Sequence, residues 1–133
     1  MPINSRNKGA SAEREVAQIL RDELGIETKR NLEQWRSGGS DILGVPGFAI
    51  EVKRAAKPLI AQWWAQTVSQ AELVKELPCL WYRLDRRSWR VLLPLWAICA
   101  DAHPSYDLEW TAEITPEAFC MIARERMNDS NHH

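Results

Sequence analysis

The sequence has few cysteines and no long hydrophobic run. Its 133 residues include only three cysteines, Cys79, Cys99 and Cys120, and these form no CxxC pair. An odd number of cysteines without metal-ligand spacing argues against a disulfide framework and favours reduced thiols in or near a core, as in a cytosolic protein. No apolar stretch approaches the roughly 18 residues of a membrane span, and "MPINSRNKGAS" lacks the apolar region of a signal peptide.

The sequence also lacks internal repeats, low-complexity segments and recognisable linkers. With 45 % hydrophobic and 26 % charged residues, its composition is that of a globular protein. A chain of this length can bury roughly two thirds of its unfolded surface, so it needs no disulfide to fold. We therefore expect one domain over residues 1–133, with its chemical motifs within 8–84 and an extension of unknown role at 91–133.

Charge is unevenly distributed although the net charge is only −1. Residues 1–90 hold 15 Lys and Arg against 11 Asp and Glu, whereas residues 91–133 hold 2 against 7. Such a chain can present a positive face to a polyanion; the alternative is an ordinary scatter of surface charge. Zinc-finger and helix-turn-helix signatures are absent, so any binding of DNA should depend on its structure rather than its base sequence.

Hydrophobic periodicity and turn residues predict the order of the elements. A helix is expected over 9–24 with Gly25 as its stop, and a weak strand over 27–35. Strands at 41–45 and 48–53 form a hairpin around Pro46-Gly47. A second helix over 57–78, strands at 79–84 and 89–95, and a helix from Pro116 with Thr115 as its N-cap follow. The stretch 96–110 remains unassigned.

Two acids and a lysine meet in this hairpin. In "FAIEVK", Ile50 and Val52 point into the core, while Glu51 and Lys53 share the opposite face, about 7 Å apart. Asp41 begins the partner strand at the same end or near it. Two carboxylates so close repel each other, and a divalent cation such as Mg²⁺ would relieve that repulsion. The alternative is an exposed Glu–Lys pair on a solvated strand.

These residues resemble the PD-(D/E)xK nuclease superfamily, with "SD" at 40–41 and "EVK" at 51–53. The expected element order is similar to that superfamily's restriction-endonuclease-like α/β core of a helix, a three-stranded meander, a helix and further strands, here with a C-terminal helix. "KGASAERE" at 8–15 and Ser37-Gly38 resemble the Holliday junction resolvase branch, phage and archaeal members included. Ser40 replaces the superfamily's proline, at a position that carries no ligand.

The resemblance implies roles for particular residues. Asp41 and Glu51 would bind Mg²⁺ (or Mn²⁺), with Glu13 as a further ligand or nearby acid, and Lys53 would activate or position the water. Ser37 and a glutamine of the second helix would support them. Gln62, Gln66 and Gln70 form one polar stripe, from which Gln66 is preferred; the alternative is a solvated stripe.

Helical phase agrees with the choice of Glu13. Glu13 lies three residues before Val16, on the flank of the predicted buried side, whereas Glu15 is expected to point elsewhere and to pair within the helix. A plain surface glutamate remains the alternative for Glu13.

Several basic residues could follow a phosphate track. They lie around the loop, after the motif and in the turn at 85–88, and comprise Lys29, Arg30, Arg36, Arg54, Lys57, Arg86 and Arg87. The resemblance further implies a homodimer in the cytoplasm of a bacterial or phage-infected cell, for which an exposed Trp64 would suit the interface.

Together these features predict a Mg²⁺-dependent endonuclease that hydrolyses phosphodiester bonds of branched DNA, by in-line attack of an activated water. One alternative is a restriction-like or nicking nuclease acting on duplex DNA. The other is a non-catalytic module that binds DNA or protein on the same fold.

Overall fold

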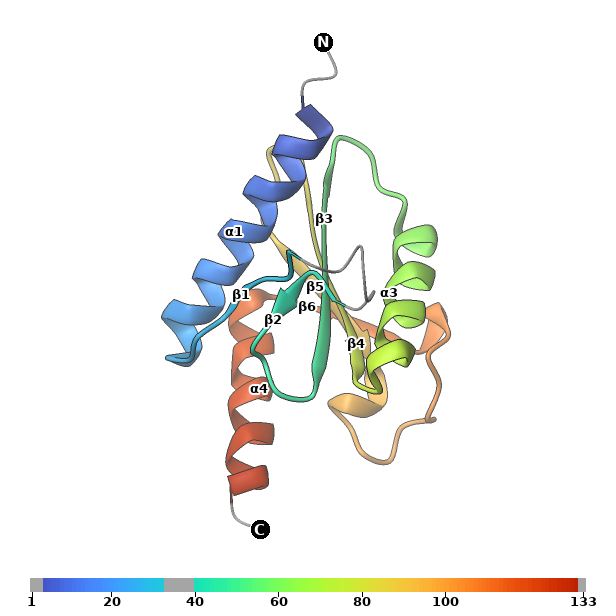
Figure 1. Ribbon diagram of the computed structural model, residues 1–133. Helices are drawn as coiled ribbons and strands as arrows, with labels where there is room; N and C mark the ends of the chain where they lie inside the picture. Colours follow the sequence, from blue (N-terminus) through green and yellow to red (C-terminus); the bar gives the residue numbers. More distant parts are fainter. Residues whose placement is uncertain (1–3, 33–39, 132–133) are drawn as a thin grey trace.

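The structure is a computed structural model that describes residues 4–32 and 40–131 (Figure 1). In this part of the chain six strands form one sheet in the order β1-β2-β3-β4-β5-β6. The strands are β1 Lys29–Arg30, β2 Ile42–Leu43, β3 Phe48–Ala55, β4 Leu77–Leu84, β5 Arg90–Pro94 and β6 Thr111–Ile114. The helices are α1 Asn4–Leu24, α3 Ile60–Val74 and α4 Pro116–Asn131, with 3-10 turns η1 Leu95–Ala97 and η2 Leu108–Trp110.

The sheet mixes two kinds of pairing. β1, β2 and β3 form an antiparallel meander, in which Ile42 pairs with Ile50. β3 and β4 are parallel, with Glu51 opposite Leu80, and α3 is the crossover that parallel neighbours require. β4, β5 and β6 are again antiparallel. The predicted order and the restriction-endonuclease-like α/β class are thus confirmed.

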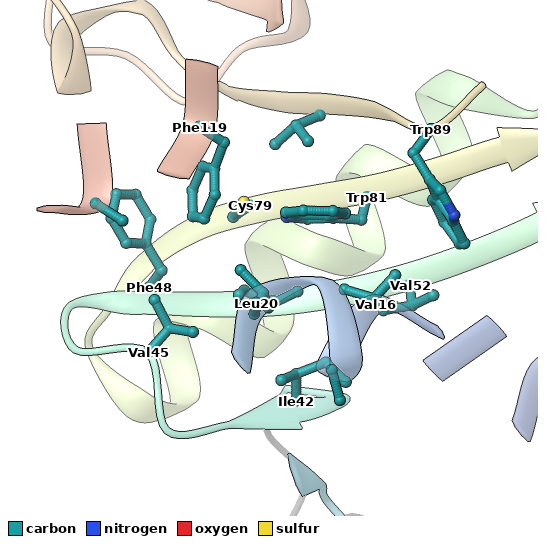
Figure 2. Close-up of a cluster of buried hydrophobic side chains, with 14 of the residues drawn as sticks. Val16, Leu20, Ile42, Val45, Phe48, Val52, Cys79, Trp81, Trp89 and Phe119 are labelled. Atoms are coloured by element: carbon teal, nitrogen blue, oxygen red, sulfur yellow. The ribbon is translucent and has the colours of Figure 1, made fainter. Parts of the chain in front are cut away.

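Helices cover both faces of the sheet (Figure 1). On one face, Val16 and Leu20 of α1 and Phe119 of α4 pack with Trp81 in the main hydrophobic cluster, which Figure 2 shows. On the other face, Trp63 and Trp64 of α3 pack against Leu80, Tyr82 and Leu92. Residues of β5 and α4 contribute to the main cluster, so the segment after residue 90 is part of the same core.

The helix ends follow from backbone chemistry. α1 ends before Gly25, which has φ 66° and whose N–H donates to the carbonyl of Arg21 at 3.0 Å. α3 is shorter than the predicted 57–78: it begins two residues after Pro58 and ends at Val74, before Lys75, a left-handed residue whose N–H donates to the carbonyl of Ala71. At α4 the Thr115 hydroxyl accepts from the N–H of Ala118 at 3.1 Å, which confirms this residue as the N-cap.

Residues 95–114, mostly without a predicted structure, fold against α3 and the sheet edge. They form η1, η2 and the edge strand β6. Trp64 is buried, and its indole N–H donates to the carbonyl of Tyr106 at 2.7 Å, so it does not offer the exposed side chain that would suit a dimer interface. None of the described helices is long and apolar enough to cross a bilayer.

Candidate active site

Asp41 immediately precedes β2 and is held against β3. Its backbone N–H donates to the carbonyl of Ile50, and its carbonyl accepts from the N–H of Asn31, both at 2.8 Å. Its carboxylate Oδ2 accepts from the N–H of Val52 at 2.8 Å. Since that N–H follows Glu51 directly in the chain, the bond places the Asp41 carboxylate beside Glu51. Asp41 is buried, with 6 % of its surface exposed.

Glu51 is the acid of β3 that faces α3. Its neighbours Ile50 and Val52 belong to the cluster under α1, whereas its partner across the parallel pair, Leu80, belongs to the cluster under α3. The predicted alternation along "FAIEVK" is therefore confirmed. Glu51 is only 3 % exposed, so the alternative of a solvated Glu–Lys pair is excluded for this acid.

The carboxyl groups of Asp41 and Glu51 are so close that the charge of Asp41 opposes ionisation of Glu51. Burial, reinforced by the charge of Asp41 and by a hydrogen bond with it, raises the pKa of Glu51 to about 9, and the Lys53 ammonium opposes this rise. At neutral pH the metal-free pair of Asp41 and Glu51 therefore retains a proton. A nearby cation would favour the doubly ionised pair, because it would replace that proton as the balancing charge.

Glu13 approaches the pair from α1. Its Oε1 accepts from Nε of Arg30 on β1 at 2.9 Å, in a half-buried ion pair. Burial raises the pKa of Glu13; the Arg30 hydrogen bond opposes the rise, Asp41 adds to it, and Lys53 lowers it. The structure thus brings Glu13, Asp41, Glu51 and Lys53 into one electrostatic group, with Arg30 bound to its outer acid.

Two carboxylates of this group, those of Asp41 and Glu51, lie together and could hold a metal ion. Within residues 4–32 and 40–131, no three His, Cys, Asp or Glu side chains gather as a ready ligand set. The pair of Asp41 and Glu51 nevertheless fits a hard divalent cation, because Mg²⁺ commonly takes one or two protein carboxylates and fills its other positions with water and phosphate. The role of Glu13 as a further ligand stays a prediction.

Asn31 and Ser40 hold the segment that carries Asp41, and sequence reasoning gave neither this role. Asn31 Nδ2 donates to the carbonyl of Ser40 at 2.9 Å, and the buried Ser40 hydroxyl donates to the carbonyl of Ile42 at 3.0 Å. An asparagine within the weakly strand-like stretch 27–35 carries no signal of its own, since its contacts depend on the fold around it.

Glu15 also faces the sheet, contrary to the expectation that it points elsewhere. Its Oε1 accepts from Nη1 of Arg83 and from the indole N–H of Trp89, both at 2.8 Å. Glu13 and Glu15 therefore reach different strands from neighbouring parts of one helix. Glu15 ties α1 to the β4–β5 hairpin, away from Asp41.

The other predicted site residues lie partly at the surface and partly outside the described residues. Gln66 and Gln62 are exposed on α3 and Gln70 is half-buried, so the choice of Gln66 stays a prediction. Ser37 and Arg36 lie outside the described residues. Arg54 is near Asp85, with 3.9 Å between Nε and Oδ1. Lys29, Lys57, Arg86 and Arg87 are exposed, and among the ion pairs of the described residues none involves these four.

The turn between β4 and β5 carries two exposed cations, Arg86 and Arg87, which form no ion pair within residues 4–32 and 40–131. Arg86 adopts φ 66°, a left-handed conformation, and the N–H of Arg87 closes the turn on the carbonyl of Leu84 at 3.0 Å. We expect the double variant Arg86→Asn, Arg87→Gln to weaken DNA binding and to reduce its salt slope by up to about two, because each arginine would neutralise one phosphate. Asparagine is chosen because it tolerates positive φ.

Salt-titrated binding of DNA measures this effect, with Arg124→Gln as the matched control, an exposed arginine of α4. An unchanged slope would mean that the turn faces away from DNA.

Glu51→Gln should stabilise the metal-free protein at neutral and alkaline pH. The folded pKa of about 9 exceeds the ordinary 4.5, so between these values the folded state keeps a proton that the unfolded state has lost. Stability therefore falls as pH rises across this window. Because glutamine has no such proton, the advantage of the variant should be absent at pH 4 and grow toward pH 9, by at most about 1.4 kcal/mol per pH unit.

Urea unfolding in EDTA at several pH values measures this difference. An advantage that does not change with pH would contradict the raised pKa of Glu51.

Comparison with known proteins matches the chain to a family model and to solved structures. The chain matches the family model described as "Phage putative PDDEXK endonuclease" over residues 4–125. Among solved structures it is similar to Hjc, a Holliday junction resolvase of the archaeal hyperthermophile Archaeoglobus fulgidus, at 27 % identity and a TM-score of 0.48, over 63 % of this chain and 70 % of that one. The search of curated proteins finds no match. Since the family model spans nearly the whole chain, the protein belongs to the phage PDDEXK endonucleases and is a nuclease.

Proposed function

We propose that this nuclease cleaves branched DNA with Mg²⁺ held by Asp41 and Glu51. PDDEXK nucleases generally use divalent metals and act on DNA. The observation that carries the metal assignment is the buried pair itself: the Asp41 carboxylate is fixed by the Val52 N–H beside an acid whose pKa is raised to about 9. Burying two carboxyl groups together opposes the stability of the fold, and such pairs are found mainly at functional sites.

The chain's own residues have distinct parts in this proposal. Asp41 and Glu51 hold the cation, which when bound supplies positive charge at the phosphate and acidifies a nearby water. Lys53, on the same face of β3 as Glu51, opposes the rise in the pKa of Glu51, and its ammonium would lie where charge develops in the transition state. Arg30 holds Glu13, which is proposed as a further ligand or a nearby acid.

The choice of branched DNA depends on the sequence resemblance to the resolvase branch, through Glu13 in "KGASAERE" and the Ser-Gly loop. It is tested with a four-way junction, a flap, a nicked duplex and a linear duplex of matched base sequence, each with Mg²⁺. Faster cleavage of the junction by at least about tenfold supports the proposal. Equal or faster cleavage of linear duplex would instead assign a restriction-like or nicking nuclease.

The resemblance also leads us to propose a homodimer acting in the cytoplasm of a phage-infected or bacterial cell. Two copies would present two sets of Asp41 and Glu51 to a four-way junction. Sedimentation at several protein concentrations, with and without the junction, tests the dimer. A monomer under both conditions would contradict it.

A further inference from the structure

Lys53 is a half-buried side chain whose direction no ion pair fixes. None of the ion pairs within residues 4–32 and 40–131 involves it. A lysine has a flexible four-carbon stem, and an unrestrained stem loses much rotamer entropy when its ammonium is fixed in one place. If Lys53 acts at the reacting atoms, packing must therefore restrict its stem.

Tyr82 is the direct neighbour of Lys53 in the sheet. β3 and β4 are parallel, and Lys53 pairs with Tyr82 as Glu51 pairs with Leu80 (Figure 1). Adjacent strands lie about 4.8 Å apart, and side chains at paired positions point to the same face. Tyr82 and Leu80 belong to the cluster under α3. The phenol ring of Tyr82 therefore lies beside the stem of Lys53 on that face.

The ring of Tyr82 is held by contacts of its own. Its hydroxyl donates to Glu113 of β6, and the other carboxylate oxygen of Glu113 accepts from Nε of Arg90 on β5 at 3.2 Å. The Trp63 ring of α3 lies at 6.0 Å, centroid to centroid. Tyr82 is only 9 % exposed. Because these contacts come from three other elements, the ring is fixed before DNA binds.

The acids lie on the other side of Lys53. The described pairing of β3 with β2 ends at Ile50, so no strand of the described ranges pairs with Lys53 on that side. The ammonium lowers the pKa of Glu51 and of Glu13, which places it near both acids. A stem that is limited by the Tyr82 ring on one side is thus directed toward the acids on the other.

We propose that Tyr82 is a positioning residue for DNA cleavage, whose ring restricts the Lys53 stem so that the ammonium stays beside the metal-binding acids. The hydroxyl is bonded to Glu113, so the ring is the part of Tyr82 that acts on Lys53. The inference rests on the proposed role of Lys53 in the chemistry. Holding a reacting group in place raises the rate at saturating substrate, because less entropy is lost on reaching the transition state.

Side-chain NMR relaxation of the metal-free protein without DNA tests the restriction itself. The Cε order parameter of Lys53, assigned with Lys53→Arg, should exceed those of the exposed Lys29 and Lys57. It should fall to their level in Tyr82→Leu and stay high in Leu92→Val, a matched core variant of the same cluster. A wild-type Lys53 as mobile as Lys57 would overturn the inference.

Single-turnover cleavage at saturating DNA and Mg²⁺ tests the consequence. Tyr82→Leu should lower the rate about tenfold and leave the dissociation constant of DNA within about twofold of wild type. Tyr82→Phe, which keeps the ring, should recover most of that loss, and Leu92→Val should cleave at the wild-type rate. If Tyr82→Leu does not fold, Tyr82→Val replaces it, since β-branched residues suit a strand.

A double-mutant cycle distinguishes positioning from general support of the fold. In the Lys53→Ala background, Tyr82→Leu should change the rate by less than about twofold, because the ring then has no stem to restrict. The same tenfold loss in that background, or a wild-type rate for Tyr82→Leu when Lys53→Ala is slow, would refute the inference and leave the proposed role of Lys53 intact. Full activity of Lys53→Ala would refute both.

Discussion

Asp41→Asn should reduce the rate of DNA cleavage at least about 1000-fold while leaving DNA binding nearly unchanged. The carboxylate contributes a full negative charge to the proposed metal site, and losing several kcal/mol of charge stabilisation corresponds to a rate loss of this size. The fold should persist, because an asparagine oxygen can still accept from the Val52 N–H and its amide can donate to Glu51. Single-turnover cleavage with Mg²⁺ measures the rate.

Three further experiments test whether the effect is specific to the proposed metal site. Asp101→Asn, an exposed acid far along the chain from the β2–β3 hairpin, should cleave at the wild-type rate. Ca²⁺ should support binding without turnover, because it accepts oxygen ligands with looser geometry. If Asp41→Asn fails to fold, Glu51→Gln tests the same site. A stable Asp41→Asn protein with full activity would refute the metal assignment.

The centre of this site could be predicted because strand geometry has a period of two. Once "FAIEVK" is a strand with Ile50 and Val52 inward, Glu51 must face the other way, and the Pro46-Gly47 turn brings the start of the preceding strand back beside it. The bond from the Val52 N–H to the Asp41 carboxylate is the result. Local rules therefore sufficed to bring Asp41 beside Glu51, whereas the choice between a buried acid pair and a solvated Glu–Lys pair needed the family resemblance.

The partners of the two glutamates on α1 could not be predicted in the same way. Helical phase indicates which side of a helix a residue occupies, but a long side chain on the flank can reach a strand far away in sequence. Glu15 contacts Arg83 and Trp89, which lie 68 and 74 residues further along the chain. These pairings depend on where the β4–β5 hairpin packs, which no local pattern encodes.

The burial of both Trp63 and Trp64 could not be predicted from local rules either. On a helix with one covered side, adjacent residues point about 100° apart, so only one should be fully buried. Here Trp63 packs on the sheet, while Trp64 also bonds to the backbone of the segment after β5. Since residues 96–110 gave no periodic signal, their cover over α3 became visible only in the folded chain.

Lys53→Ala should separate chemistry from affinity. Its ammonium shares a face of β3 with Glu51, and its charge lowers the pKa of both Glu51 and Glu13. Removing a group that stabilises charge in the transition state should lower the single-turnover rate roughly 100-fold or more, with little change in DNA affinity. Substitution of the exposed arginines of the β4–β5 turn should have the opposite effect. Because phosphate contacts position the DNA, their loss should weaken binding and leave the saturated rate near wild type.

Titration with Mg²⁺ and pH then distinguishes the two ways in which Lys53 could act. If its charge serves only to keep Glu51 and Glu13 ionised, higher pH or more Mg²⁺ should restore the saturated rate of Lys53→Ala, because either condition drives the last proton from the acids. If the ammonium acts at the reacting atoms, the rate should stay low at every Mg²⁺ concentration and pH, and this is the result that we expect. A variant that loses affinity but keeps its rate would make Lys53 a phosphate-binding residue, and Asp41 and Glu51 alone would then account for the chemistry.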